Sequence, residues 1–518
     1  MKLRRLLCIA FACVTLLSGC TNQESETLNI ERPTLEGENT MESITLNLQI
    51  DSVSKKGNKA TTDNNPISST VFCADPTAVE YNGRLYVIGT NDHQQCDAVG
   101  LDGENHYGFI KSLVIFSTED MANWTYHGRI EVDKISPWVF ASWAPTITSR
   151  VEEDGLTHFY LYYSNSGCGV GVLTATDPLG PWTDPLGRPL IEFNTPGLGE
   201  CPNPFDPGVM IDDNGVGWLS FGAGIGEHGS VYMPGSARIV QLGDDMISFA
   251  SDFVEIPSPY LFEASELNYI NGTYVYTYNT RWDERTIWDN DKYEAPPACS
   301  MAYMTTKTPL VRDSWEYRGH YFLNPGDVGM SYSNNHTHLH KFKGEYYIIS
   351  HSLILKDSMK IAGGFRSLMA DNIKVNEKKL EIELIGTSTE GAKQIEPLNP
   401  YYAHCGTEAS ISADIGYVDS DGELNNVSAV SKTAGSWLYI KGAKFKDTAK
   451  FMASVKGKGR IEIRIDSKDG DVAAAIEFDC DELTTVYTNN VNVPNGEHGF
   501  YIVFSDENIV LDAWEFAK

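Results

Sequence analysis

Carboxylic acid side chains stand near the start of three similar segments that lie far apart in the sequence. Asp75 begins "DPTAVEYNG", Asp206 begins "DPGVMIDDNG" and Glu263 begins "EASELNYING". If the segments met in space, one carboxylic acid could protonate a leaving oxygen while one carboxylate activated water or attacked carbon, as hydrolysis of a glycosidic bond requires. A third carboxylate nearby would keep the acid protonated, because close carboxylates resist ionising together. The trio is therefore a candidate site for glycoside hydrolysis.

The three segments belong to a unit that occurs five times. Each copy has a polar or charged opening, an apolar strand, a tight turn and an aromatic strand. The copies are "ADPTAVEYNGRLYVIGT", "WAPTITSRVEEDGLTHFYLYYS", "FDPGVMIDDNGVGWLSFG", "FEASELNYINGTYVYTYN" and "NNHTHLHKFKGEYYIISHS". Their openings lie roughly 55 to 75 residues apart, enough for one four-stranded propeller blade each. Short strands alone would also fit a β-sandwich, but the fivefold repeat favours an all-β, five-bladed β-propeller over residues 67–398.

A propeller would bring the five openings together. The innermost strand of each blade lines the central channel, so equivalent openings should meet around one axis. We take these openings to be Asp75, Ala144, Asp206, Glu263 and His336. An Asp-Pro dipeptide alone more often begins a turn, so the site depends on this common register. Glu266 would point to the opposite face from Glu263 on an extended strand, and so lie at a blade interface or the rim.

Charge and composition narrow the class of partner. Forty Lys and Arg residues against 70 Asp and Glu residues give a formal net charge of −30. This charge would repel a polyphosphate and argues against nucleic acid as the main partner. The chain has 26 Tyr and 10 Trp residues, a bias that suits strands and surfaces that stack on sugar rings.

The N-terminus has the pattern of an export signal. "MKLRRLLCIAFACVTLLSGC" has a basic start, a short apolar run and a small-residue site. Its "LSGC" ending resembles a bacterial lipobox, which would make Cys20 the lipidated first residue of an exported protein. We expect a signal peptide at 1–20, a polar linker at 21–66, and an outer-membrane, cell-surface or periplasm-facing lipoprotein. A plain secretory signal is the alternative.

The remaining cysteines carry no metal or redox motif. Seven of them lie beyond Cys20, widely scattered and without a CxxC pair. We expect a few disulfides at most.

Taken in order, the five segments resemble the signature segments of glycoside hydrolase family 43 over roughly residues 70–398. The resemblance implies a propeller and an inverting mechanism that needs no cofactor. It also implies release of terminal α-L-arabinofuranose from plant hemicellulose or pectin side chains, with β-xylosidase activity as runner-up. In the roles so implied, Asp75 is the general base, Glu263 the general acid, and Asp206 the residue that tunes and orients the acid.

The same resemblance marks three residues for substrate binding. Trp143 in "SWAP" is similar to an active-site residue that stacks on sugar, although a core tryptophan would look the same. Phe262 precedes the expected acid and is expected to contact substrate. Arg366 in "GGFRS" resembles a channel-facing arginine, with a surface salt bridge as the alternative.

The histidines of "HTHLH" form a possible metal site. His336, His338 and His340 alternate and would share one face of a strand, a spacing that can bind zinc. The family resemblance instead implies a hydrated calcium ion beside His336.

Residues 399–518 resemble carbohydrate-binding module family 6, a jelly-roll-like β-sandwich. Glu408 is the nearest candidate for the module's usual acidic opening, and Tyr487 stands where a tryptophan is common. The domain could therefore bind sugar, with or without calcium, or only support the propeller. Two hypotheses from other classes stay open, namely a non-catalytic glycan-binding lipoprotein and a hydrolase built on a metal at "HTHLH".

Overall fold

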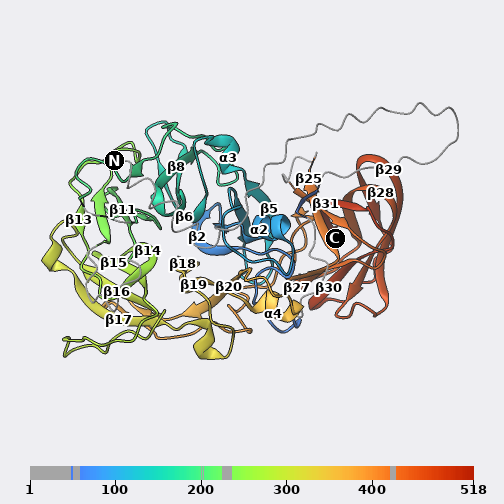
Figure 1. Ribbon diagram of the computed structural model, residues 1–518. Coiled ribbons are helices and arrows are strands. Elements are labelled where there is room, and N and C mark those ends of the chain that lie inside the picture. Colours follow the sequence, from blue (N-terminus) through green and yellow to red (C-terminus); the bar gives the residue numbers. More distant parts are fainter. Residues whose placement is uncertain (1–47, 51–58, 200, 202, 225–235, 421–426) are drawn as a thin grey trace, which may run out of the picture. The chain divides into compact units, whose positions relative to one another are not determined.

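The computed structural model describes residues 48–50, 59–199, 201, 203–224, 236–420 and 427–518. Five antiparallel sheets follow one another along the chain and form the five blades of a β-propeller (Figure 1). The predicted all-β, five-bladed propeller is confirmed.

The first four blades each contain four strands in chain order. Blade 1 is β2 (Ala74–Tyr81), β3 (Arg84–Thr90), β4 (Leu113–Thr118) and β5 (Thr125–Ile130). Blade 2 is β6 (Trp143–Val151), β7 (Thr157–Ser164), β8 (Gly169–Ala175) and β9 (Ile191–Glu192). Blade 3 is β10 (Gly208–Ile211), β11 (Gly217–Phe221), β12 (Arg238–Gln241) and β13 (Val254–Glu255). Blade 4 is β14 (Leu261–Ile270), β15 (Thr273–Thr280), β16 (Met301–Thr306) and β17 (Glu316–Phe322).

Blade 5 differs from the four-stranded unit that the repeat predicts. It contains three described strands, β18 (Thr337–Phe342), β19 (Glu345–Ser352) and β20 (Ser367–Ile373), followed by the hairpin of β21 (Val375–Asn376) and β22 (Glu381–Ile382). The chain just before blade 1 lies against β20, where the Ile67 amide donates to the Leu368 carbonyl at 2.9 Å. The two ends of the propeller sequence therefore meet at blade 5.

The inner strands form a closed ring. They contact one another in the order β2, β6, β10, β14 and β18, and β18 contacts β2 again. Buried threonines join neighbouring blades, since Thr77 Oγ1 accepts from the Ile147 amide and Thr146 Oγ1 accepts from the Val209 amide, both at 3.1 Å. The ring is what brings the starts of five distant strands together.

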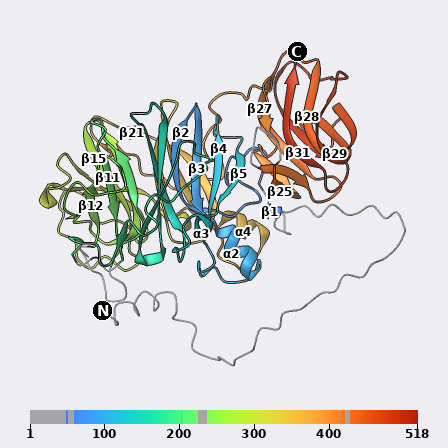
Figure 2. The ribbon, with the colours of Figure 1, turned by 90° about the horizontal axis from the view of Figure 1, so that it is seen from above.

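Three short helices lie at the end of the blades where these strands begin. They are α2 (Asp92–Val99), α3 (Val132–Ile135) and α4 (Ile354–Met359), and Figure 2 shows them at one end of the propeller. Each follows a strand that runs back toward that end, namely β3, β5 or β19.

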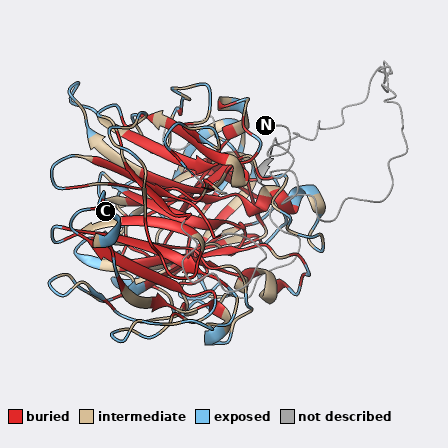
Figure 3. Ribbon diagram, turned by 60° about the vertical axis from the view of Figure 1, so that its left-hand side comes forward, coloured by how far each residue is buried: buried red, intermediate tan, exposed pale blue. Residues whose placement is uncertain are grey.

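The aromatic strands of the repeat fill the spaces between blades. Tyr162, Tyr163, Tyr276 and Tyr278 are fully buried, and Figure 3 shows buried residues running along the strands. This burial explains why apolar and aromatic residues follow one another almost without interruption in the aromatic strand of each unit, instead of alternating strictly with polar residues.

The C-terminal region is a second β domain. Its strands are β23 (His404–Cys405), β24 (Ile411–Ala413), β25 (Ile415–Asp419), β26 (Val427–Ser431), β27 (Trp437–Phe445), β28 (Lys450–Ile465), β29 (Val472–Thr488), β30 (Gly496–Phe504) and β31 (Val510–Ala517). β28 pairs with β31 along its first half and with β30 along its second half, so the sheet folds over a common core. The predicted sandwich-like domain is confirmed.

The two domains share one hydrophobic core. Trp124 and Tyr126 of blade 1 belong to the same buried cluster as Ile415 and Tyr417 of the C-terminal domain. The rings of Tyr126 and Tyr417 lie 4.5 Å apart between centroids.

Residues 59–66, the C-terminal end of the predicted linker 21–66, contact both domains. Asn64 Nδ2 donates to the Ala392 carbonyl at 2.6 Å, and Lys59 Nζ donates to the Ser410 carbonyl at 2.9 Å. β1 (Leu48–Ile50) pairs with β25. The predicted signal peptide, Cys20 and the rest of the predicted linker (21–47 and 51–58) lie outside the described residues. Within the described ranges, no helix is long and apolar enough to cross a membrane.

Candidate active site

The starts of four inner strands share an uncommon backbone conformation. Asp75, Ala144, Asp206 and Ala264 have φ values of 48°, 39°, 50° and 62°, in the left-handed region that residues other than glycine rarely adopt. The strand pairing is irregular at three of these places, on β2, β6 and β14. Such strain is found where the surrounding structure holds a functional residue in place.

This pattern corrects the register expected for blade 4. The counterpart of Asp75 and Asp206 is Ala264, and Glu263 stands one residue earlier. A bulge that twists the strand places the expected acid beside the shared position rather than at it.

The same bulge makes the expected orientation of Glu266 wrong. Glu263 lies opposite Asn279 and Glu266 opposite Thr277, so three steps on β14 match two on β15. Ladder partners two residues apart lie on one face, so Glu263 and Glu266 share a face. Glu266 is nevertheless buried between blades 4 and 5, where its Oε1 lies 2.7 Å from His338 Nδ1.

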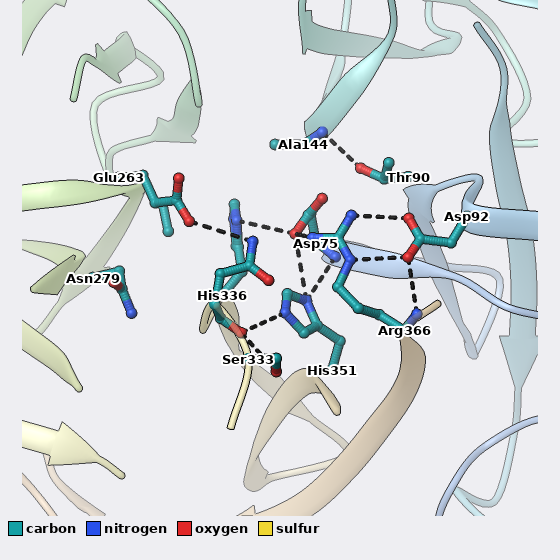
Figure 4. Close-up of polar contacts among 12 residues, drawn as sticks. Asp75, Thr90, Asp92, Ala144, Glu263, Asn279, Ser333, His336, His351 and Arg366 are labelled. Carbon is teal, nitrogen blue, oxygen red and sulfur yellow. Dashed lines mark hydrogen bonds and ion pairs between the residues drawn. The ribbon is translucent and has the colours of Figure 1, made fainter. Parts of the chain in front are cut away.

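Side chains from the preceding blade hold three of the strained residues by their main-chain amides. Thr90 Oγ1 accepts from the Ala144 amide at 2.8 Å, and Ser164 Oγ accepts from the Asp206 amide at 2.8 Å. His351 Nδ1 accepts from the Asp75 amide at 3.1 Å, across the closure of the ring. Figure 4 shows the first and third of these contacts beside the channel.

Asp75 lies against positive charge. Its Oδ1 is 2.8 Å from Arg366 Nη1 and 3.7 Å from His336 Nδ1 (Figure 4). Burial acts to raise the pKa of Asp75, but the charge of Arg366, together with a hydrogen bond from Thr90, outweighs it and holds the pKa below its usual value. Asp75 is therefore ionised near neutral pH, as a general base must be.

Arg366 is buried and fixed by a second carboxylate. Its Nε and Nη2 contact the two oxygens of Asp92 at 3.0 and 2.8 Å in a bidentate pair. The side chain is 3% exposed, so the alternative of a surface salt bridge is wrong. Asp92 positions the guanidinium that keeps Asp75 charged.

Glu263 and Asp206 form the opposite environment. Burial, followed by the charge of Asp75, raises the pKa of Glu263 to about 7. Burial, followed by Glu263 and Asp75, raises the pKa of Asp206 well above its usual value. Asp206 Oδ2 accepts from the Ala264 amide at 2.8 Å, and Asn334 Nδ2 donates to Glu263 Oε1 at 3.4 Å. Glu263 and Asp206 therefore hold at least one proton between them near neutral pH, whereas the carboxylate of Asp75 holds none.

Two comparisons with known proteins bear on this arrangement. The sequence profile of glycosyl hydrolases family 43 matches residues 63–282, and that of the carbohydrate binding module (family 6) matches residues 410–518. An arabinoxylan arabinofuranohydrolase of Bacillus subtilis (strain 168) is 32% identical over 493 residues, which are 88% of this chain and 93% of that protein. The chain belongs to glycosyl hydrolases family 43.

Further likenesses extend over both domains of this family 43 enzyme. An arabinoxylan arabinofuranohydrolase of Paenibacillus polymyxa is 30% identical over 90% of this chain and 76% of its own length. The crystal structure of a family 43 arabinoxylan arabinofuranohydrolase from Bacillus subtilis, in complex with cellotetraose, is 31% identical. It superposes with a TM-score of 0.82 over 90% of this chain and 99% of that chain. The predicted family and its glycosidase activity are confirmed.

The three residues predicted to bind substrate lie in different surroundings. Trp143 is half-buried, and its Nε1 donates to the Tyr107 carbonyl at 3.2 Å. Tyr107 in turn covers the Arg366 guanidinium, 4.9 Å from its ring centroid. Phe262 is half-buried, and its carbonyl accepts from the Gly224 amide at 2.8 Å. Trp143 thus belongs to the surroundings of Arg366, and Arg366 contacts the expected base.

The residues around His336 do not make a calcium site by themselves. Calcium takes six to eight oxygen ligands, whereas His336 offers nitrogen. Its carboxylate neighbour Asp75 is bound to Arg366, and Glu266 is bound to His338. Among the described residues, no group of three or more His, Cys, Asp and Glu side chains could hold a metal ion.

Glu408 and Tyr487, the two residues considered above in the C-terminal domain, also lie in different surroundings. Glu408 is buried and paired with His404 Nδ1 at 2.8 Å, so its carboxylate is already occupied. Tyr487 is 59% exposed, and Lys450 Nζ lies 4.2 Å from its ring centroid. None of the seven cysteines in the described part of the chain forms a disulfide bond.

Sequence patterns did not predict Asp92, Asn334 or His351. A signal for His351 is present in the repeat, because it stands one residue before the end of the aromatic strand of its unit, close to the place where Thr90 and Ser164 end theirs. No comparable signal marks Asp92, which follows β3 at the start of α2.

Proposed function

We propose that this family 43 glycosidase releases terminal α-L-arabinofuranose from an arabinoxylan-type plant polysaccharide, with inversion at the anomeric carbon. The observation that carries the proposal is the opposite protonation of two facing carboxyl groups. Arg366 keeps Asp75 ionised, whereas burial and nearby carboxylate charge raise the pKa of Glu263 to about 7. This division suits one base and one acid.

The reaction follows from these two states. Asp75 takes a proton from water, and the water oxygen bonds to the anomeric carbon. Glu263 gives its proton to the glycosidic oxygen as the bond from that oxygen to the anomeric carbon breaks on the opposite face of the sugar. Asp206 Oδ2 accepts from the Ala264 amide, next to Glu263, and so helps to orient the acid. Proton exchange with solvent then restores both carboxyl groups.

Arabinose is favoured over xylose by the relatives that match most of the chain. The two similar proteins described above are both named arabinoxylan arabinofuranohydrolases. A Bacteroides ovatus protein named xylosidase/arabinosidase is 23% identical over 55% of this chain, so β-xylosidase activity is kept as the second candidate. The carboxylate trio argues against a purely glycan-binding role.

Aryl glycosides of arabinofuranose, xylose and galactose test the proposal. We expect fastest hydrolysis of the arabinofuranoside, release of arabinose from arabinoxylan, and an inverted anomer as the first product in NMR spectra. Faster cleavage of the xyloside would replace the substrate. A retained anomer would remove Asp75 from the role of base.

A lipid anchor on Cys20 is the second part of the proposal. The lipobox-like "LSGC" supports it, and an anchored glycosidase would keep its product close to the cell. Cys20→Ser is expected to move the protein from the membrane fraction to the soluble fraction. Equal membrane binding of this variant and the wild type would contradict the anchor.

Calcium beside His336, or in the C-terminal domain, is an expectation from the family resemblance alone. Full activity and an unchanged unfolding temperature after chelation would count against it. The C-terminal domain is proposed to bind the same polysaccharide, because residues 410–518 match a carbohydrate binding module. Affinity electrophoresis of the whole protein in arabinoxylan would test this binding.

A further inference from the structure

His351 lies where the ring of blades closes. It is fully buried one residue before the end of β19 in blade 5, close to the place that Thr90 and Ser164 occupy at the ends of β3 and β7. Those two hydroxyl groups hold the main chain of the next blade. Because blade 5 is followed in space by blade 1, His351 holds the main chain of Asp75. The residue that closes the ring thus also fixes the expected base.

The contacts of His351 define the protonation of its ring. Nδ1 accepts from the Asp75 amide at 3.1 Å and must carry a lone pair. Nε2 lies 2.9 Å from the Asn334 carbonyl oxygen, which can only accept a hydrogen bond. The imidazole is therefore neutral, with its proton on Nε2. Burial, followed by the charge of Arg366, lowers the pKa of His351 to about 3, in agreement with this state.

Asn334 continues the contacts to the expected acid. Its main chain accepts from His351, and its side-chain Nδ2 donates to Glu263 Oε1 at 3.4 Å. His351 therefore stands between the backbone of Asp75 and the side chain of Glu263. The spacing of these two carboxyl groups decides whether a water molecule fits between base and sugar. A misplacement of about 1 Å can lower a rate about a hundredfold.

We propose that His351 is a positioning residue for the hydrolysis, holding Asp75 through Nδ1 and, through Nε2 and Asn334, also Glu263. Thr90 and Ser164 have one oxygen each and serve one neighbouring blade. A neutral imidazole has a donor and an acceptor about 2 Å apart on a rigid ring, so it can fix two segments at once. The inference rests on the proposed roles of Asp75 and Glu263.

Two substitutions each keep one half of these contacts. His351→Asn places an amide oxygen near the position of Nδ1 and keeps an acceptor for the Asp75 amide. His351→Gln places an amide N–H near the position of Nε2 and keeps a donor to Asn334. The kcat and KM values of both variants, of His351→Ala and of the wild type are compared on two glycosides of one sugar. One glycoside has an activated aryl leaving group and the other a poor alkyl leaving group.

The dependence of kcat on the leaving group should distinguish the contact to the Asp75 amide from the contact to Asn334. His351→Ala loses both contacts, so kcat is expected to fall about a hundredfold on the aryl glycoside and further on the alkyl glycoside, with little change in KM. His351→Asn should stay close to the wild type on the aryl glycoside, which needs little protonation, and lose about tenfold on the alkyl glycoside. In His351→Gln, kcat should fall by one and the same factor on the aryl and the alkyl glycoside, because the misplaced Asp75 slows the attack of water on both. A purely structural role would lower both rates equally in every variant.

A second buried histidine supplies the control. His127 on β5, the outermost strand of blade 1, lies 2.6 Å from Ser117 Oγ, and His127→Asn should keep the wild-type ratio of the two rates. Full activity of His351→Ala, or one constant ratio in all His351 variants, would overturn the inference.

A measurement on the wild type covers the case in which the variants do not fold. ¹⁵N NMR of the histidine rings should show one that stays neutral with its proton on Nε2 from roughly pH 5 to 8, and no such ring would also overturn the inference. If the wild type cleaves none of the glycosides, the proposed function fails together with this inference. If it cleaves them and the variants show no contrast, only the inference fails.

Discussion

Asp75 in blade 1 and Asp206 in blade 3 occupy the same place in the repeat and carry opposite pKa shifts. Both precede proline, both have a positive φ, at 48° and 50°, and both have an amide held by the preceding blade in space. The side chain of Asp75 contacts Arg366, whereas that of Asp206 is held by the hydroxyl of Ser164 and the amide of Ala264.

The difference shows how one repeat supplies two kinds of carboxyl group. The backbone of the repeat fixes where a carboxyl group stands, and the neighbouring blade fixes its charge. Blade 5 brings a guanidinium to Asp75, and blade 4 brings Glu263 to Asp206. The following substitutions test this division, beginning with the largest expected effect.

Asp75→Asn removes the ionised member of the comparison. We expect kcat to fall roughly 10³- to 10⁴-fold, because water loses its base. The loss should be similar for good and poor leaving groups, since protonation of the leaving oxygen is untouched. Measured kcat values on a series of aryl glycosides check this, and a loss confined to poor leaving groups would assign Asp75 to the acid instead.

Glu263→Ala removes the protonated partner. We expect a loss of about a hundredfold or more on glycosides with poor leaving groups, and a smaller loss on activated ones. Glu266→Ala is the matched control, because Glu266 lies on the same strand and contacts His338. If Glu266→Ala shows the dependence on leaving group and Glu263→Ala does not, the acid is assigned to the wrong residue.

Arg366→Gln should make Asp75 resemble Asp206. Arg366 is the main group that lowers the pKa of Asp75, so its loss raises that pKa. A base works only when ionised, so the acidic limb of the plot of kcat/KM against pH should move to higher pH. An unmoved acidic limb in a folded variant would mean that Arg366 does not set the charge of Asp75.

Glu263→Gln removes the acid and lowers the rate as Glu263→Ala does, and in addition it should produce the smallest effect of the series, a change in stability. The raised pKa of Glu263, about 7 against 4.5, means that folding favours its protonated form. This contribution is complete below pH 4.5 and is lost as pH rises through 7. Glutamine does not ionise, so the unfolding temperature of the variant should gain on the wild type by a few degrees between pH 5 and 8. Asp75→Asn should show the opposite sign at lower pH, because folding favours ionised Asp75 and the wild type loses this contribution only as pH falls below 3.8. Equal pH dependence of both variants would contradict the comparison.

The sequence predicts most of the fold because the repeat is explicit. Five openings with aromatic strands specify five blades, and the Asp-Pro openings mark Asp75 and Asp206. The sequence predicts the register of Glu263 less accurately, because a bulge at Ala264 breaks the two-residue period on which a strand register depends.

The supporting residues of the site were harder to predict for a different reason. Asp92 and His351 act on Asp75 through Arg366 and through the backbone, and they meet it only when blade 5 closes on blade 1. Their chemistry depends on contacts between segments roughly 270 residues apart, which local sequence patterns do not encode.

The two domains share a hydrophobic core, and this affects how the enzyme can evolve. The core includes Trp124, Tyr126, Ile415 and Tyr417. A binding module joined by a bare tether can be exchanged between enzymes by recombination, because neither part loses contacts. Here, cutting at residue 398 would expose apolar side chains on both sides and would remove the Ser410 carbonyl from Lys59. The catalytic and C-terminal domains are therefore expected to stay together in related proteins, and substitutions on their contact surfaces are expected to be correlated.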